Sequence, residues 1–152
     1  MKTDVEYGFG PHLMLDLYGC PKEKLADIDF VFNVLDTFPD KIKMTKIMPP
    51  YVFKYHGKVA EDWGVSGVVL IAESHISIHT FPDKEYAFID IFSCKEFDTD
   101  YARAELLDLF SATHHEVAIL NRGVEFPKHI GRAANLISRE RRGLAVAPRV
   151  YH

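Results

Sequence analysis

The fold of this chain is decided by the stretch VSGVVLIAESHISIHTFPDKEYAFIDIFSC, which spans residues 65–94. Its first part, residues 65–72, is apolar and rich in β-branched side chains, which predicts a strand covered on both faces. Residues 75–81 and 86–94 alternate in polarity and predict two further strands. The segment 82–85 between them suits a short hairpin loop. The stretch therefore predicts neighbouring antiparallel strands of one sheet.

The residues before this stretch predict a strand, a helix and an extended segment. Residues 10–18 alternate in polarity, which predicts a strand. A helix is predicted from Pro21 until Pro39, where proline lacks the amide that a longer helix would use. Its predicted apolar stripe, at intervals of three and four, is Leu25, Ile28, Phe32 and Leu35. A strand over residues 43–48 is interrupted by Pro49 and Pro50 and followed by extended residues 51–55.

The residues after the stretch predict one helix and one more strand. Asp98 or Thr99 caps the helix, and its predicted stripe is Tyr101, Ala104, Leu107 or Leu106, and Phe110. Residues 115–121 predict the last strand, and residues 133–139 predict a further helix. The order β-α-β-β-β-β-α-β indicates an α+β fold. We expect a two-layer α/β sandwich, with a mainly antiparallel sheet and the helices on one face.

The two faces of the predicted sheet differ in chemistry. One face is aliphatic and suits packing by helices: Ile76, Ile78, Ala87, Ile89 and Ile91. The other face is aromatic and polar: His75, Ser77, His79, Phe81, Tyr86, Phe88, Asp90, Phe92 and Cys94. Two helices cover only one side, so this second face would be bare in a monomer, and such a face is normally a partner surface. We therefore expect a homodimer with this face inside, a four-layer αββα arrangement.

Composition and charge place the chain among ordinary globular proteins. It has 152 residues, 47% hydrophobic and 26% charged, which suits one domain over residues 1–121. Residues 122–152 form a basic tail with a net charge of +5, against −9 for residues 1–121. The tail has few aromatic residues, so docking on the acidic body or simple solvation is expected, and nucleic-acid binding is not.

The N-terminus and the cysteines suggest a cytoplasmic protein. The sequence has neither an apolar run of membrane-spanning length nor the apolar centre of a signal peptide at its start, so no membrane association is expected. Its two cysteines, Cys20 and Cys94, are expected to be reduced thiols.

Several chemistries compete for the polar residues of the central stretch. Glu73, His75, His79 and Cys94 are zinc-ligand types, but His-x-x-x-His pairs its imidazoles on a helix and this segment is predicted as a strand. No metal site is therefore expected. Ser74 lacks the Gly-x-Ser-x-Gly setting of a serine hydrolase. Cys94 and His79 would also serve a cysteine hydrolase. The simplest alternative makes His79 a hydrogen-bonded sheet histidine and Cys94 a buried apolar group.

Taken together, the segments of the central stretch resemble the core of the bacterial and archaeal S-adenosylmethionine decarboxylases. They are residues 64–75, then Ile78-His79-Thr80, then residues 90–94. The segment 10–13, with Asp16 and Tyr18, is similar to the first strand of that family. The resemblance covers roughly residues 8–121.

This resemblance implies a proenzyme that cuts itself between Glu73 and Ser74. Ser74 would attack the carbonyl of Glu73, and elimination followed by hydrolysis would turn Ser74 into a pyruvoyl group, the cofactor. Ser66 matches the residue that helps the processing intermediate to form, and His79 matches the residue that assists proton removal. We expect both near the cleaved bond, which would lie in a strained turn between two strands.

The family decarboxylates S-adenosylmethionine for spermidine biosynthesis. Its pyruvoyl ketone forms a Schiff base with the substrate amine and accepts the electrons of the carboxylate, as pyridoxal phosphate would. Cys94 matches the general acid that reprotonates the substrate carbon. Phe81 and Asp83 match residues that hold the adenosine, where the family often has tryptophan and glutamate. A second aromatic residue is also expected, with Phe53, Tyr55 and Trp63 as candidates.

Two alternatives stay open at the level of sequence. The same pyruvoyl chemistry would serve a decarboxylase of arginine or ornithine. An unprocessed homologue would act instead as a regulatory partner of a true decarboxylase.

Overall fold

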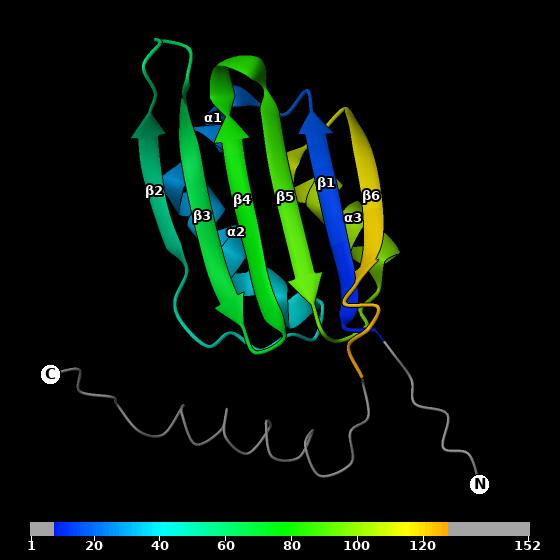
Figure 1. The fold of residues 1–152 in the computed structure, drawn as a ribbon. Helices are drawn as coiled ribbons and strands as arrows, with labels where there is room; N and C mark the ends of the chain where they lie inside the picture. Colours follow the sequence, from blue (N-terminus) through cyan, green and yellow to red (C-terminus); the bar gives the residue numbers. More distant parts are fainter. Residues whose placement is uncertain (1–7, 128–152) are drawn as a thin grey trace, which may run out of the picture.

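A computed structural model gives the structure of this chain and describes residues 8–127, so the helix predicted over residues 133–139 lies outside the described residues. One sheet has the strand order β2-β3-β4-β5-β1-β6, and all neighbouring pairs are antiparallel (Figure 1). Its strands are β1 (Gly10–Tyr18), β2 (Tyr51–His56), β3 (Trp63–Ile71), β4 (Ser74–Phe81), β5 (Tyr86–Ser93) and β6 (His114–Arg122).

The helices lie behind the sheet in Figure 1, so the predicted two-layer α/β sandwich is confirmed. They are α1 (Lys22–Leu25), α2 (Ile28–Lys41) and α3 (Thr99–Phe110), with a short 3-10 helix, η1 (Pro82–Lys84), in the β4–β5 hairpin. The buried face of the sheet is the predicted aliphatic one, because Ile76, Ile78, Ala87, Ile89 and Ile91 are at most 2% exposed. Burial of these side chains against α2 and α3 is the main source of stability.

The other face of the sheet, which we call the open face, points toward the viewer in Figure 1. No helix of residues 8–127 covers it. Strand alternation places five large apolar side chains there that are 39–63% exposed: Tyr51, Phe53, Leu70, Tyr86 and Leu120.

The first predicted helix is divided in two, and its predicted stripe is partly wrong. Asp27 begins α2 by accepting hydrogen bonds from the amides of Asp29 and Phe30, so one helical repeat does not run through from Leu25. Ile28 is exposed, and the buried side chains of α2 are Val31, Val34, Leu35, Phe38 and Pro39. Pro39 also does not end the helix, because it lies in the last turn, where one missing amide interrupts little of the hydrogen bonding.

Two smaller predictions are also corrected. Residues 43–48 form only a single bridge, Lys46 to Ile71, because Lys43 has a left-handed φ of 60° and prolines follow the segment. The buried stripe of α3 consists of Ala102, Leu106 and Phe110, while Tyr101 is 42% exposed. Asp98 is the residue that caps α3, and it accepts from the Tyr101 amide at 2.9 Å.

Candidate active site

The Glu73–Ser74 bond lies at the tight connection between β3 and β4, at the lower end of the sheet in Figure 1. The carbonyl oxygen of Glu73 accepts a hydrogen bond from the backbone amide of Cys94 at 2.9 Å. The Glu73 carboxylate accepts from the Thr45 amide at 3.2 Å. The carbonyl of the bond is thus held by a backbone N–H donor.

The conformation of Ser74 bears on the strain expected at this bond. Ser74 has a positive φ of 159°, at the limit of the range that residues with side chains adopt, and it pairs with Ile71 on β3 and Ser93 on β5. The bond thus combines this backbone conformation with a hydrogen bond to its carbonyl oxygen.

Cys94 follows the last residue of β5 and lies half-buried beside this bond. The start of β1 runs against it so closely that a Cβ on Gly10 would lie 2.9 Å from the Cys94 Cα and 1.9 Å from the Ser93 carbonyl oxygen. The other cysteine, Cys20, is fully buried, and burial raises the pKa of its thiol to about 11. Cys20 is thus an inert core residue, and Cys94 is the thiol at the junction.

Ser66 and His79 form a pair of their own at a different place. They are directly opposite in the β3–β4 register, and the Ser66 hydroxyl lies 2.9 Å from His79 Nδ1. His79 lies five positions along β4 from Ser74, which corresponds to about 17 Å at roughly 3.4 Å per residue. Within one chain, the pair therefore does not lie beside the Glu73–Ser74 bond as expected, because an extended strand separates the two.

Asp83 lies still further away, in η1 at the upper end of the sheet. It accepts hydrogen bonds from Lys22 Nζ at 2.6 Å and from the indole nitrogen of Trp63 at 2.7 Å. These two donors hold the pKa of the Asp83 carboxyl below its usual range, with Lys22 as the larger cause. Phe81 instead contacts Phe88, with ring centroids 5.4 Å apart.

Among the three candidates for the second aromatic residue, the structure therefore links Trp63 to Asp83. The hydroxyl of Tyr55 instead donates to Asp62. Phe53 lies on β2 directly opposite Ser66.

Sequence reasoning missed a cluster around Phe92 on the open face, at the same end as Cys94. The Arg122 guanidinium lies over the Phe92 ring, 4.1 Å from its centroid. The rings of His12 and His75 lie 5.5 and 5.7 Å from that of Phe92. Burial, then the neighbouring His12, lowers the pKa of His75, so this imidazole is neutral at pH 7. The signal available in the sequence was the alternation that places Phe92 and Cys94 on one face.

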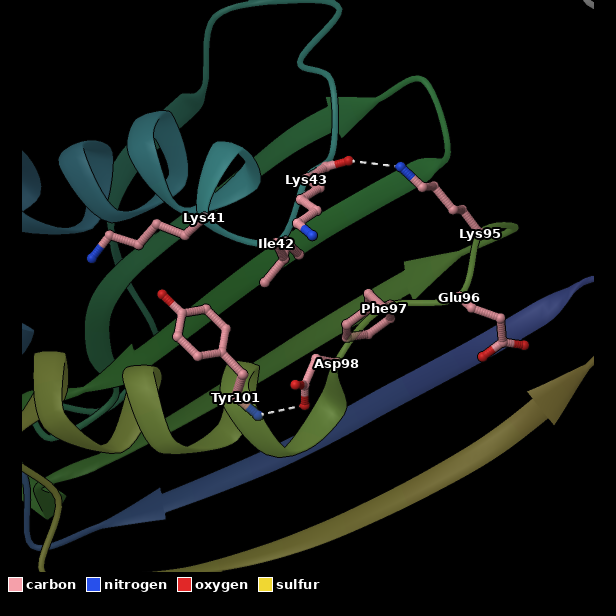
Figure 2. Close-up of a pocket in the computed structure, with 8 residues that line it drawn as sticks. All are labelled: Lys41, Ile42, Lys43, Lys95, Glu96, Phe97, Asp98 and Tyr101. Atoms are coloured by element: carbon pink, nitrogen blue, oxygen red, sulfur yellow. Dashed lines mark hydrogen bonds between the residues drawn. The ribbon is translucent and has the colours of Figure 1, made fainter.

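A cavity of about 530 Å³ lies in the helix layer, between the end of α2 and the start of α3 (Figure 2). It is lined by Lys41, Ile42, Lys43, Lys95, Glu96, Phe97, Asp98 and Tyr101. No candidate residue of the active site lines this cavity.

Metal and membrane features can be stated for the described part of the chain. Within residues 8–127, no group of three or more His, Cys, Asp or Glu side chains is arranged to hold a metal ion. Over the same residues, no helix is both long enough and apolar enough to cross a bilayer.

Known proteins with this two-layer sandwich include a decarboxylase. The crystal structure of the adenosylmethionine decarboxylase from Aquifex aeolicus superposes with a TM-score of 0.68 at 25% identity, covering 82% of this chain and 98% of that one. The family model of S-adenosylmethionine decarboxylase matches residues 11–123.

Two curated relatives have the same family name. The S-adenosylmethionine decarboxylase proenzyme of Pyrococcus furiosus is 36% identical over 117 residues, 76% of this chain and 80% of that protein. The proenzyme of Geobacillus kaustophilus is 39% identical over 116 residues, 76% of this chain and 88% of that protein. This chain belongs to the S-adenosylmethionine decarboxylase family.

Proposed function

We propose that this chain is a proenzyme that cuts itself between Glu73 and Ser74 and then decarboxylates S-adenosylmethionine. The observation that carries the proposal is the hydrogen bond from the Cys94 amide to the Glu73 carbonyl oxygen, 2.9 Å long, at the bond that would be cut. The names of the relatives support this substrate over arginine and ornithine. The word proenzyme in the name of the relative supports cleavage of this chain over the alternative of an unprocessed regulatory partner.

Cleavage would begin when the Ser74 hydroxyl oxygen adds to the Glu73 carbonyl carbon. Negative charge then develops on the carbonyl oxygen, where the Cys94 amide already donates. Expulsion of the Ser74 nitrogen gives an ester. Loss of the Ser74 Cα proton, assisted by a histidine, releases the Glu73 carboxylate and leaves dehydroalanine. Addition of water then releases ammonia and leaves a pyruvoyl group on residue 74.

The residues at the junction fit such a group. Ser74 follows the held carbonyl directly, and Cys94 lies beside it with a side chain of the type that donates a proton. When formed, the pyruvoyl ketone supplies the electrophile that binds the substrate amine and draws electrons from the carboxylate bond. Cys94 would then protonate the substrate carbon after carbon dioxide leaves.

A second chain would supply the other half of the site. Ser66 and His79 lie about 17 Å along β4 from Ser74, beyond side-chain reach. Two open faces packed about a two-fold axis would bring this pair of one protomer to the Ser74 of its partner. The exposed apolar side chains of the open face give such a dimer its driving force. Phe81 and Asp83 lie still further along, so their contact with the nucleoside would also be made across the dimer.

The experiment that tests this function is an intact mass spectrum of the purified protein. We expect two fragments, residues 1–73 and residues 74–152, the second with a terminal pyruvoyl in place of serine. The Ser74→Ala variant should give one uncut chain, and His79→Ala should stop at an ester that hydroxylamine cleaves. A single full-length mass for the parent protein would contradict the proposal.

A further inference from the structure

The cluster around Phe92 holds a positive charge that the cleavage step does not use. Arg122 is the last residue of β6 and is paired in register with Gly10, whose backbone lies against Cys94. Its guanidinium covers the Phe92 ring at 4.1 Å. Phe92 and Cys94 are two residues apart on one face, about 7 Å at strand spacing. The guanidinium and Cys94 therefore lie at the same end of the open face.

The contacts of Arg122 differ from those of Arg103, the other arginine among residues 8–127. Arg103 lies on α3, and its guanidinium pairs with the Asp100 carboxylate at 3.3 Å. The Arg122 guanidinium has no carboxylate partner within the described residues, although the chain up to residue 121 has a net charge of −9. A guanidinium stacked on an aromatic ring keeps its N–H edges available for a planar, bidentate anion.

We propose that Arg122, held over Phe92, binds the α-carboxylate of the amino-acid substrate. The assignment rests on the proposed function, because it places this carboxylate beside the group formed from Ser74 and the thiol of Cys94. The His12 and His75 imidazoles border the Phe92 ring, and His12 contacts the Asp90 carboxylate on the same face at 3.3 Å, so the negative charge nearest this cluster already has a partner. Burial and then the neighbouring His12 lower the pKa of His75; Asp90 opposes this shift, and the Arg122 charge adds to it.

The reaction itself predicts the kinetic signature of such a contact. The carboxylate loses its charge as the carbon–carbon bond breaks and carbon dioxide forms. The contact with Arg122 is therefore stronger before the transition state than in it. Removing an interaction of this kind weakens binding and leaves kcat unchanged or raised. Arg122 would thus select substrates that carry a carboxylate, without taking part in bond breaking.

The test uses cleaved enzyme in which borohydride has reduced the pyruvoyl ketone, so that ligands bind without turnover. Calorimetry compares S-adenosylmethionine with its methyl ester, which lacks only the negative charge. In Arg122→Gln we expect binding of S-adenosylmethionine to weaken about tenfold, as for the loss of one charge-assisted hydrogen bond. Binding of the methyl ester should change less than about twofold, and Arg122→Lys should lie between. Arg103→Gln is the matched control and should change neither.

In active enzyme, Arg122→Gln should raise KM for S-adenosylmethionine without lowering kcat. Equal weakening of both ligands in Arg122→Gln would overturn the carboxylate assignment while leaving the proposed substrate intact. Unchanged binding of both would overturn it as well. If the parent enzyme bound neither ligand, the proposed substrate would be wrong, and the assignment would be withdrawn with it.

Discussion

The two ends of the sheet carry different parts of the chemistry. At the lower end in Figure 1, Ser74 begins β4, Cys94 directly follows β5, and the bond before Ser74 is held by a backbone amide. Toward the upper end, Ser66 and His79 form a hydrogen-bonded pair that touches none of these groups. The lower end therefore holds the Glu73–Ser74 bond and the His12 and His75 imidazoles, whereas His79 and its partner Ser66 lie away from that bond. The difference teaches that, if Ser66 and His79 act on the Glu73–Ser74 bond as proposed, the pair must come from a second copy of the chain.

The largest expected effect comes from mixing two inactive variants. Ser74→Ala and His79→Ala, expressed alone, should each stay uncut. Expressed together in equal amounts, mixed dimers would place the His79 of one chain beside the Ser74 of the other. About half of the His79→Ala chains should then be cut, as random pairing of two protomers requires. Denaturing electrophoresis with a tag on one chain measures this. Complete absence of cutting in the mixture would place both halves in one chain and break the comparison.

The second effect separates cutting from turnover at the lower end alone. Cys94→Ala keeps its backbone amide, so cleavage should proceed as in the parent protein. Decarboxylation should fall by about 10²-fold or more, the usual contribution of a general acid. Release of labelled carbon dioxide measures the loss. Cys20→Ala, in the core on the other side of the sheet, is the matched control and should decarboxylate normally. Full activity of Cys94→Ala would remove the thiol from the mechanism.

A smaller effect is expected at the upper end, where Asp83 accepts from both Trp63 and Lys22. Asp83→Asn should weaken binding of S-adenosylmethionine about threefold to tenfold, in the range of one hydrogen bond to a charged group. Trp63→Phe keeps an aromatic ring and frees one carboxylate oxygen. If Asp83 binds the ribose directly, Trp63→Phe should bind as tightly as the parent. Equal weakening in both variants would show instead that Asp83 acts by holding Trp63.

The smallest expected effect is on stability and concerns Asp16 on β1. Partial burial, then the carboxylates of Glu116 and Asp90, raises the pKa of Asp16. The folded chain therefore holds this proton more tightly than the unfolded chain, and Asp16 lowers stability once the pH exceeds the raised pKa. Asp16→Asn should raise the free energy of unfolding at pH 7 by less than about 0.5 kcal/mol, because the group is largely solvated. The gain should vanish below the ordinary pKa of 3.8. Urea unfolding measures it, with Asp40→Asn as the control.

The strands could be predicted because alternation is a local signal. Residues 75–81 and 86–94 show it clearly, and the two faces that it predicts agree with the observed burial. The buried side chains of α2 were harder to predict. Asp27 begins a new helix there, and no local rule says which of its residues then face the sheet. The distance between Ser74 and the Ser66–His79 pair could have been predicted from the sequence, because residues 75–81 are predicted as an extended strand and five residues of a strand span about 17 Å. The family resemblance alone does not reveal this distance, because residues close together in the sequence need not be close in space.

The donor to the Glu73 carbonyl could not be predicted at all. It is a backbone amide, and any residue at position 94 would supply it. Arg122 was equally hidden, because its place over Phe92 depends on the pairing of β6 with β1 and not on a nearby motif.

If the chain is cut as proposed, the position of β1 between β5 and β6 decides how the two fragments are held together. Residues 1–73 hold β1, β2 and β3, and the rest of the chain holds β4, β5 and β6. Three of the five strand pairings, β3 with β4 and β1 with both β5 and β6, then join different molecules. Unfolding of the mature protein becomes a dissociation, so its melting temperature should depend on concentration. Refolding would require two fragments to find each other, which makes the intact precursor the only efficient route to the folded enzyme.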